Sequence, residues 1–470
     1  SNYTNNVLIL KNRQKTVKTI LNMNITEINN NIIKIKNIEK DIYWLFDDKT
    51  PELNKLLDDI YFKYEWLNHG WILSLNANYK MYISVFIAAI SPIISTIIPY
   101  FILYYYGFKM SFKDFINLTK VGYKSLTRLT NGTNSELIRY ITNTFMVFSY
   151  FSNLVSNYEN SCKYHKIINI IKNKMNSIDL LIEYTNKIKK IDIFSELNCD
   201  KDIINIQKNM GKEITKYKHK YLYFYKNITK FKDYIFNILN YIGNIDMFIS
   251  ISILVNKGYC FTNYLNKELP FFEVSKIFHP CLQEKNIKND IIIDNNSLIT
   301  GPNQSGKSVI MKSILISIIL GQTIGISPAE TCSFTIFTYL NSFINVSDNL
   351  GTSSLFEEEI NRAVNIINTV NELSNNEFSF IIMDEIFRST SILEGMSIAF
   401  SFCYEISKIK NCLFFISTHF KYLTKIKNLD KYKTIINYDN NKNPIFTYKI
   451  ENGISEDKIA LKLLKNKMNN

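Results

Sequence analysis

The chain has 470 residues, which exceeds the usual size of a single compact core and predicts two domains. Hydrophobic residues make up 46% of it and charged residues 21%, a balance typical of folded proteins and opposed to large-scale disorder. The formal net charge of +13 suits a polyanionic partner such as nucleic acid, or an anionic membrane surface.

The seven cysteines form no Cys-x-x-Cys pair and have no histidine at ligand spacing. This pattern argues against a zinc site and against a disulfide framework, so we expect a reducing, intracellular compartment. Residues 1–18 are polar and basic without a sustained apolar core, and we expect no cleavable signal there.

Residues 1–245 are expected to form an all-α region, because apolar residues recur there at spacings of three and four. One stripe comprises Leu21, Ile25, Ile28, Ile32, Ile35 and Ile42, and a second comprises Tyr164, Ile168, Ile171, Met175, Ile178 and Ile182. A repeat near about 3.5 residues favours helices packed lengthwise on a partner, as levers do. We favour an intrachain bundle over an intermolecular coiled coil.

A long apolar run occupies residues 81–106, which contain no charged side chain. One interpretation is membrane association, as a span or as a re-entrant or interfacial hairpin, since about 20 apolar residues cross a bilayer. The other is a buried helix-turn-helix, because Pro92 and Pro99 would each break a helix in water. The sequence leaves both interpretations open.

Lysines and aromatic rings alternate between Lys216 and Lys232. The lysines could neutralise phosphates while the rings stack on bases. We favour an amphipathic helix whose rings face the core, because Ile235, Leu239 and Ile242 continue an apolar helical face.

A phosphate-binding loop stands in the C-terminal half, with a predicted strand before it and a predicted helix, Val309 to Leu320, after it. Its residues are Gly301, Pro302, Asn303, Gln304, Ser305, Gly306, Lys307 and Ser308, which fit the Walker A pattern. Glycines let backbone N–H groups close around phosphate oxygens, and the helix N-terminus favours negative charge. Lys307 is expected to reach the β- and γ-phosphates of ATP, and Ser308 to ligate Mg²⁺.

A second nucleotide motif, of the Walker B kind, ends the apolar strand 378–383. Asp384 is expected to hold Mg²⁺, and Glu385 to act as general base toward the attacking water, as in ATPases of the ABC type. A third apolar strand, 412–417, delivers His419 near its C-terminal end, where open α/β sheets place their ligands. His419 is expected to sense the γ-phosphate. We therefore predict an ATP-hydrolysing α/β domain.

These motifs together resemble the MutS family of DNA mismatch-repair ATPases, and the resemblance covers residues 246–470. The family's TGPN-x-x-GKS loop corresponds to residues 300–308, its S-T-F-x-x-E segment to 354–359, its D-E-x-x-R-G-T-S segment to 384–391 and its A-T-H-F segment to 417–420. Ser389 replaces the family's glycine, and Glu394 replaces its aspartate. Further similarities are Phe278-His279-Pro280, Pro328-Ala329 and the closing strand pair through Gly453.

The resemblance implies a C-terminal P-loop ATPase domain of the ABC type, preceded by a lever- or clamp-like helical region at 1–245. It implies ATP and Mg²⁺ as ligands, and a head-to-tail dimer with itself or a related subunit in which Ser354 reaches the γ-phosphate bound by the other subunit. The expected partner is DNA, held by a nucleotide-gated clamp. Given the departures from the motifs, we expect slow turnover.

Two further expectations come from what the resemblance lacks. The family's adenine-stacking aromatic would fall near Asn286, where none exists, so Ile287 is expected to contact the base. Only about 245 residues precede the ATPase, so we expect no mismatch-reading or connector domain. The triplet Phe271-Phe272-Glu273 resembles a mismatch-reading motif, but its position favours coincidence.

Overall fold

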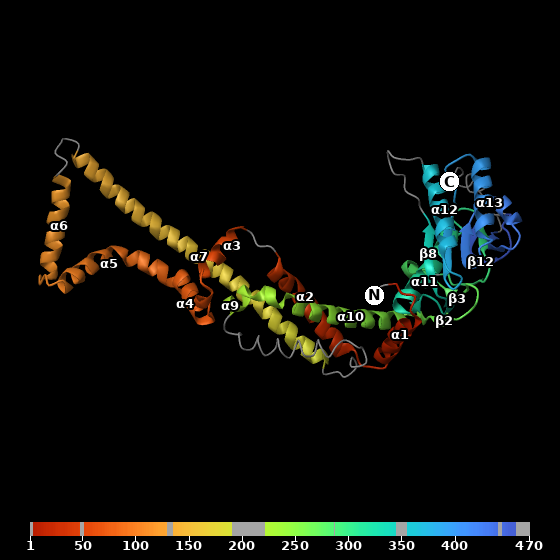
Figure 1. Ribbon diagram of the computed structural model, residues 1–470, viewed down its shortest axis with the longest axis horizontal. Coiled ribbons are helices and arrows are strands. Elements are labelled where there is room, and N and C mark those ends of the chain that lie inside the picture. Colours follow the sequence, from red (N-terminus) through yellow and green to blue (C-terminus); the bar gives the residue numbers. More distant parts are fainter. Residues whose placement is uncertain are drawn as a thin grey trace. The chain divides into compact units, whose positions relative to one another are not determined.

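The computed structural model describes residues 3–47, 51–128, 135–189, 221–285, 287–344, 355–439 and 444–456. The chain divides into two compact units (Figure 1). The nucleotide unit comprises Ser1–Ile25 and Asp246–Asn470, and the helical unit comprises Thr26–Ile245. The expected helical region 1–245 is therefore corrected at its start, where residues 1–25 belong to the nucleotide unit.

Helix α1, Val7–Leu21, explains this correction. Its apolar side chains Leu10, Val17 and Ile20 are buried, and it contacts α11, Lys307–Ile324. Between them, the buried Gln14 Nε2 donates to the carbonyls of Thr262 and Gly325 at 2.7 and 2.8 Å. The expected stripe from Leu21 to Ile42 is interrupted, since α1 ends at Leu21 and the next helix begins at Thr26.

The helical unit contains only helices among its described residues. They are α2 (Thr26–Phe46), α3 (Pro51–Ile60), α4 (Gly70–Asn78), the π-helical turn η2 (Tyr79–Ile83), α5 (Ser84–Tyr105), α6 (Phe112–Arg128), α7 (Ser135–Lys189), α9 (Tyr221–Lys226) and the start of α10 (Lys232–Asn256), with 3-10 turns η1 (Glu65–Leu67) and η3 (Ile228–Phe231).

The two predicted stripes meet inside this unit, because α2 packs along α7. Ile28, Ile32, Ile35 and Ile42 of α2 are buried, as are Tyr164, Ile168, Ile171, Met175 and Ile178 of α7. The two stripes therefore pack on each other within the chain, as an intrachain bundle requires. In the Lys-aromatic stretch, the described part from Tyr221 onward buries Phe224 and Tyr225, as the amphipathic interpretation predicts, while residues 216–220 lie outside the described residues.

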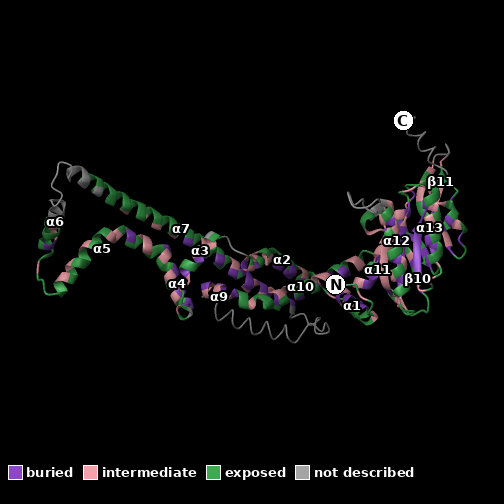
Figure 2. Cartoon of the chain, turned by 45° about the horizontal axis from the view of Figure 1, so that its top comes forward, coloured by how far each residue is buried: buried purple, intermediate pink, exposed green. Residues whose placement is uncertain are grey.

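The apolar run does not form a buried helix-turn-helix. Residues Gly70–Tyr105 form one continuous helical stretch, with Pro92 and Pro99 inside α5, and only 6% of its most apolar window is buried. Two other described helices are long and apolar enough to cross a membrane, Ile228–Asn256 and Lys307–Ile324. Their windows are 44% and 50% buried, so they pack as core helices, whereas α5 stays uncovered (Figure 2).

The nucleotide unit is built on a six-stranded sheet in the order β12-β11-β5-β10-β9-β8. These strands are β5 (Ser297–Thr300), β8 (Phe337–Phe343), β9 (Phe378–Asp384), β10 (Cys412–Ser417), β11 (Asp430–Tyr438) and β12 (Pro444–Asn452). All neighbours pair in parallel except β11 with β12. The predicted strands at 378–383 and 412–417 are therefore adjacent in one parallel sheet.

A four-stranded sheet in the order β2-β7-β3-β4 lies beside the larger one, and β1 pairs with β6. The strands of the four-stranded sheet are β2 (Asn263–Leu265), β3 (Phe272–Ile277), β4 (Asn289–Ile293) and β7 (Thr331–Thr335). The separate pair consists of β1 (Cys260–Phe261) and β6 (Ile326–Ser327). The unit also contains the 3-10 turns η4 (Pro280–Lys285) and η5 (Lys421–Lys425).

Alternating side chains of β9 divide the core of this unit into two layers, as a strand requires. Phe380 and Ile382 pack with α11 and the smaller sheet, whereas Ile381 and Met383 pack with α12 (Leu355–Glu372) and α13 (Ile392–Ile406). Helices therefore cover both faces of the sheet, an α/β architecture that leaves the strand ends free to carry polar groups.

Candidate nucleotide site

The phosphate-binding loop lies between β5 and α11, as predicted. Gly306 adopts a left-handed φ of 95° directly before the helix, a conformation that favours glycine. Gly301 is required for a different reason, since a Cβ there would lie 2.1 Å from Thr434 Oγ1. The first N–H groups of α11 consequently open onto the loop, where helix polarity favours an anion.

Lys307 lies folded into this loop and is 4% exposed. Its Nζ donates to the carbonyls of Gly301 and Pro302 at 2.9 and 3.1 Å. Burial lowers the pKa of its ammonium, and the charge of Glu385 opposes that shift. Ser305 Oγ also donates to the Pro302 carbonyl, at 2.7 Å, which closes the loop on itself.

Asp384 and Glu385 stand at the carboxyl end of β9. Ser417, at the end of β10, donates from its Oγ to Asp384 Oδ1 and accepts the Glu385 N–H at 3.1 Å through both its carbonyl and its Oγ. Glu385 has a left-handed φ of 50°, a strained conformation for a non-glycine residue. The two strands thus fix the direction in which this carboxylate points.

Three cationic or protonatable groups surround the Glu385 carboxylate, which is 13% exposed. His419 Nε2 lies 2.7 Å from Oε1, Arg388 donates to Oε2 at 2.6 Å, and Lys307 Nζ lies 3.7 Å from Oε1. The hydrogen bond from His419 is the largest cause that lowers the pKa of Glu385 from 4.5 to about 2. Glu385 is therefore ionised throughout the neutral range.

His419 also connects this carboxylate to the phosphate-binding loop, because its Nε2 lies 2.9 Å from Asn303 Oδ1. Both neighbours of Nε2 are acceptors, so this nitrogen carries a hydrogen. The structure therefore brings together four site residues that were predicted from separate motifs: Asn303, Lys307, Glu385 and His419. Arg388, which lies within the 384–391 motif but was not predicted as a site residue, joins them as an ion-pair partner of Glu385.

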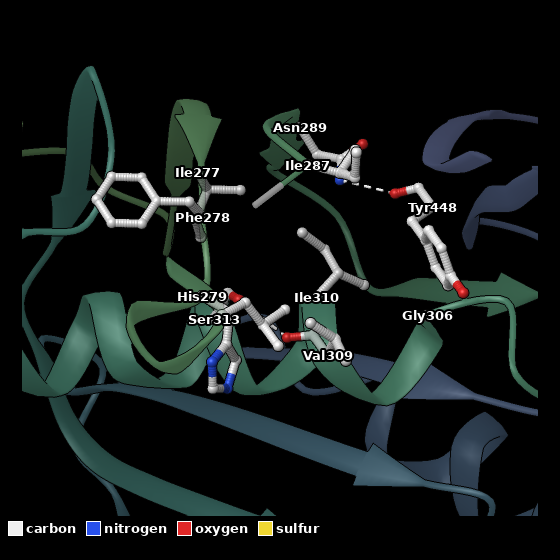
Figure 3. A pocket seen from close by; sticks show the side chains of 11 residues that line it. Ile277, Phe278, His279, Ile287, Asn289, Gly306, Val309, Ile310, Ser313 and Tyr448 are labelled. Carbon is white, nitrogen blue, oxygen red and sulfur yellow. Dashed lines mark hydrogen bonds between the residues drawn. The ribbon is translucent and has the colours of Figure 1, made fainter. Parts of the chain in front are cut away.

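A cavity of about 300 Å³ opens beside Gly306 (Figure 3). It is lined by Ile277, Phe278, His279, Leu282, Ile287, Asn289, Gly306, Val309, Ile310, Ser313 and Tyr448. Its wall is predominantly apolar with few polar groups, as expected of a small-molecule site. The predicted base contact Ile287 is among the lining residues.

Tyr448 supplies an aromatic ring to the cavity, although the sequence has no aromatic residue near Asn286. Its ring lies 3.0 Å from the point where a Cβ on Gly306 would be, and its φ of 57° is left-handed. Asn289 Nδ2 donates to the Tyr448 carbonyl at 3.1 Å, while Asn289 Oδ1 accepts the N–H of Ile450 at 3.1 Å. No local pattern connects strands β4 and β12 across this distance in sequence, so only the fold places this ring at the cavity.

The predicted Ser354 lies outside the described residues. Helix α12, which begins at Leu355, carries Glu359, a carboxylate only 6% exposed. It accepts the N–H of Phe387 at 3.2 Å and the Oγ–H of Ser389. The serine that replaces the family's glycine therefore helps to tie α12 to the loop that follows Glu385.

The residues expected to hold Mg²⁺ have suitable chemistry. A serine hydroxyl at 308 and a carboxylate at 384 are oxygen ligands of the kind that Mg²⁺ prefers. Within the described ranges, no group of three or more His, Cys, Asp and Glu could hold a metal by itself. This is compatible with a Mg²⁺ bound through substrate phosphates, which needs one or two protein oxygens.

The region that contains this nucleotide site is similar to known proteins. Residues 297–468 match the family model of MutS domain V. A DNA mismatch repair protein MutS of Thermotoga sp. (strain RQ2) is 30% identical over 200 residues, which cover 40% of this chain and 24% of that protein. That of Chlorobium chlorochromatii (strain CaD3) is 31% identical over 202 residues, covering 40% and 22%. MutS protein homolog 4 of Mus musculus is 32% identical over 198 residues, covering 38% and 20%.

The similarity thus spans about a quarter or less of the length of these relatives. It coincides with the strands and loops that assemble the site, since 297–468 begins at β5 and includes α11, β9, β10 and β12. The C-terminal part of this chain is therefore similar to MutS domain V, which is a P-loop ATPase domain.

Proposed function

We propose that the chain binds ATP with Mg²⁺ and hydrolyses it slowly to ADP and phosphate. The observation that carries this proposal is the position of Glu385, held between Lys307 and His419 at the mouth of the phosphate-binding loop. ATP would place its phosphates at the N-terminus of α11 and its base in the cavity beside Tyr448.

Each residue of the site would have a separate role in binding or hydrolysing ATP. Lys307 exchanges the Gly301 and Pro302 carbonyls for phosphate oxygens, while Ser308 and Asp384 hold Mg²⁺, which neutralises charge on the phosphates. Glu385 orients the attacking water and accepts its proton. A carboxylate with a pKa of about 2 is a weak base, because a general base works best near the operating pH, and this supports slow turnover.

His419 is proposed to sense the γ-phosphate. It contacts Asn303 in the phosphate-binding loop and Glu385 at once, so a phosphate that displaces one contact necessarily alters the other. Such a contact would link nucleotide occupancy to the position of the catalytic carboxylate.

The proposed assembly is a head-to-tail dimer, with an identical or related subunit, in which Ser354 completes the partner's site. The resemblance of segment 354–359 to the family signature supports this, as does the buried tie of Glu359 to the loop after Glu385. Through α2 and the part of α7 with buried side chains from Tyr164 to Ile178, the dimer would act as a nucleotide-gated clamp on DNA. The net charge of +13 supports that partner, as does the similarity to DNA mismatch repair proteins.

We do not include mismatch reading in the proposal. Phe271, the phenylalanine of the Phe-x-Glu triplet 271–273, is half-buried beside β3 in the nucleotide unit, where Lys267 Nζ lies 3.0 Å from its ring centroid, and this position supports coincidence. We propose a reducing, intracellular compartment, which the six described cysteines support because all are free thiols. The alternative function, a membrane-associated ATPase or an ATP-dependent scaffold on a non-DNA partner, is favoured by one feature, the uncovered surface of α5.

A subunit-mixing experiment tests the composite site. Lys307→Ala removes phosphate binding in its own subunit, and Ser354→Ala removes the contribution to the partner, so each variant alone should hydrolyse little ATP. Mixed after dissociation in equal amounts, they form heterodimers with one intact site and should recover about a quarter of wild-type turnover if dimers form at random. No recovery above the two variants measured separately would contradict the trans arrangement.

A further inference from the structure

The helical unit exposes a large apolar surface on α5. Its side chains Phe86, Ile93, Ile98, Phe101 and Ile102 are all at least half exposed. The charge-free part of α7, residues 140–158, adds exposed Phe145, Val147, Phe148, Phe151 and Val155. Figure 2 shows the part of α7 near α6 mainly as exposed and α5 as a mixture of exposed and intermediate residues. Contiguous apolar surface of this extent marks a site of contact with a partner or a membrane.

The dimensions of these stretches match the hydrocarbon core of a bilayer. The 22 residues of α5 span about 33 Å at 1.5 Å per residue, and 140–158 span about 28 Å, against a core of about 30 Å. The most apolar window of Gly70–Tyr105 has a mean hydropathy of 2.1, whereas α7 is not among the described helices that are apolar enough to cross a membrane by themselves. A helix that is apolar on all sides is stable only when it is covered, by protein or by lipid.

The backbone of α5 is also suited to an environment without water. Pro92 has no N–H to donate, which leaves the Ala88 carbonyl without its usual partner, but Ser91 Oγ donates to that carbonyl at 2.8 Å. Tyr150 of α7 donates from its hydroxyl to the Ala89 carbonyl at 2.8 Å. Membrane helices tolerate proline when side chains donate hydrogen bonds of this kind to the backbone carbonyls that proline leaves without a donor.

The chain enters and leaves this region from one side. Helices α4 and α7 both contact α9, so the helices that lead into and out of the hairpin belong to the same bundle. At the far end, α6 joins α5 to α7 (Figure 1). Tyr79 and Tyr82 lie near one end of the apolar stretch and Tyr104, Tyr105 and Tyr106 at the other, the positions in which tyrosine lines both membrane interfaces.

The surfaces of α5 and of residues 140–158 are poorly suited to bind DNA. DNA binding depends on lysine and arginine side chains that neutralise phosphates, and residues 81–106 and 140–158 contain none. A basic segment does occur between them, in α6, where Lys113 and Lys120 accompany exposed Phe112 and Leu118. This composition is typical of a helix that lies in the headgroup region of a membrane.

We propose that α5 inserts into a lipid bilayer and that the less apolar residues 140–158 of α7, which contact α5, enter with it as the second arm of a helical hairpin, with α6 at the far interface. The inference does not rest on ATP hydrolysis, since the hairpin and the nucleotide site lie in different units.

Flotation of the full chain with vesicles tests this proposal. The wild type should float with phosphatidylcholine vesicles and remain bound in about 0.5 M NaCl, which screens electrostatic adsorption. Ile98→Lys should lower the partition coefficient about a hundredfold, because a lysine at the centre of a membrane helix is strongly disfavoured. The matched control is Ile33→Lys, since Ile33 in α2 is 47% exposed and Ile98 is 51% exposed. The control should float like the wild type.

Both variants should keep wild-type ATP turnover, which shows that they fold and separates failure of this proposal from failure of the ATPase. Absence of wild-type flotation would overturn the proposal. So would binding only to vesicles that contain phosphatidylserine with release by salt, which indicates adsorption of a basic chain. A wild type that forms larger assemblies without vesicles, dispersed by Ile98→Lys, would assign the surface to a second copy instead. Loss of DNA retention in Ile98→Lys, with unchanged flotation, would assign it to DNA.

Discussion

Gly395, in the first turn of α13, provides a sensitive test of how the catalytic loop is supported. A Cβ at this position would lie 2.3 Å from the carbonyl oxygen of Phe387, whereas ordinary contacts begin at 3.4 Å. Phe387 belongs to the loop that begins at Glu385, and both residues have left-handed φ values of 59° and 50°. Because the interior is close-packed, the methyl group of Gly395→Ala has no free space, and we expect the strained loop to move by about 1 Å.

Two effects of this substitution on stability oppose each other. Alanine favours the helix over glycine by about 1 kcal/mol, whereas overpacking costs about 1–3 kcal/mol. The net loss in the free energy of unfolding is therefore about 0–2 kcal/mol, which keeps the protein folded. Catalysis is more sensitive, because a misplacement of about 1 Å can reduce a rate about a hundredfold.

The assay compares kcat for ATP, ATP affinity and denaturant unfolding in Gly395→Ala and in Ser397→Ala. Ser397 is exposed on the same helix, so alanine there gains helix propensity without any clash. We expect kcat about a hundredfold lower in Gly395→Ala with ATP affinity little changed, and wild-type behaviour in Ser397→Ala. A Gly395→Ala enzyme as fast and as stable as the control would refute the argument that this contact positions Glu385.

Other predictions follow from the cavity, from α12 and from the charge on Glu385. Tyr448→Ala should weaken ATP binding by about 1–2 kcal/mol in a titration with a fluorescent ATP analogue, whereas Tyr448→Phe should bind normally because the ring is kept; equal affinities would exclude Tyr448 from the base site. Ser389→Ala should cost about 1–3 kcal/mol in the free energy of unfolding, because the buried Glu359 loses a donor, and Ser389→Thr should restore part of it; an unchanged unfolding curve would count against that hydrogen bond. Because the folded-state pKa of Glu385 is lowered from 4.5 to about 2, its contribution to stability is complete above pH 4.5 and is lost as the pH falls toward 2. Unfolding of wild type and Glu385→Gln should therefore converge over that interval, and a difference that grew toward acid would contradict the lowered pKa.

The local parts of the nucleotide site were predictable from the sequence. Strand β9, strand β10 and the start of α11 each pair a continuous apolar segment with a motif at its end, so hydrophobic pattern and chemistry coincide. The parallel pairing of β9 with β10 then brings Glu385 and His419 together, as the rule for strand ends in α/β sheets anticipates.

What was not predictable depends on contacts between distant segments. Tyr448 reaches the cavity only because Asn289 holds the β12 backbone, and no periodic pattern encodes that hydrogen bond. Helix α1 joins the nucleotide unit through Gln14, a polar residue that carries no hydrophobic signal. The apolar run 81–106 has the composition of a core helix or of a membrane helix alike, and only the absence of covering side chains in the described residues separates the two.

The central claim, that Glu385 drives ATP hydrolysis in this chain, is tested most directly by steady-state ATP turnover of Glu385→Gln against the wild type, with ATP binding measured alongside. The substitution keeps the size of the side chain and removes its charge and basicity. The account predicts that turnover falls about 10²–10⁴-fold while ATP still binds. Turnover that equals the wild-type rate would contradict the assignment of Glu385 as the base.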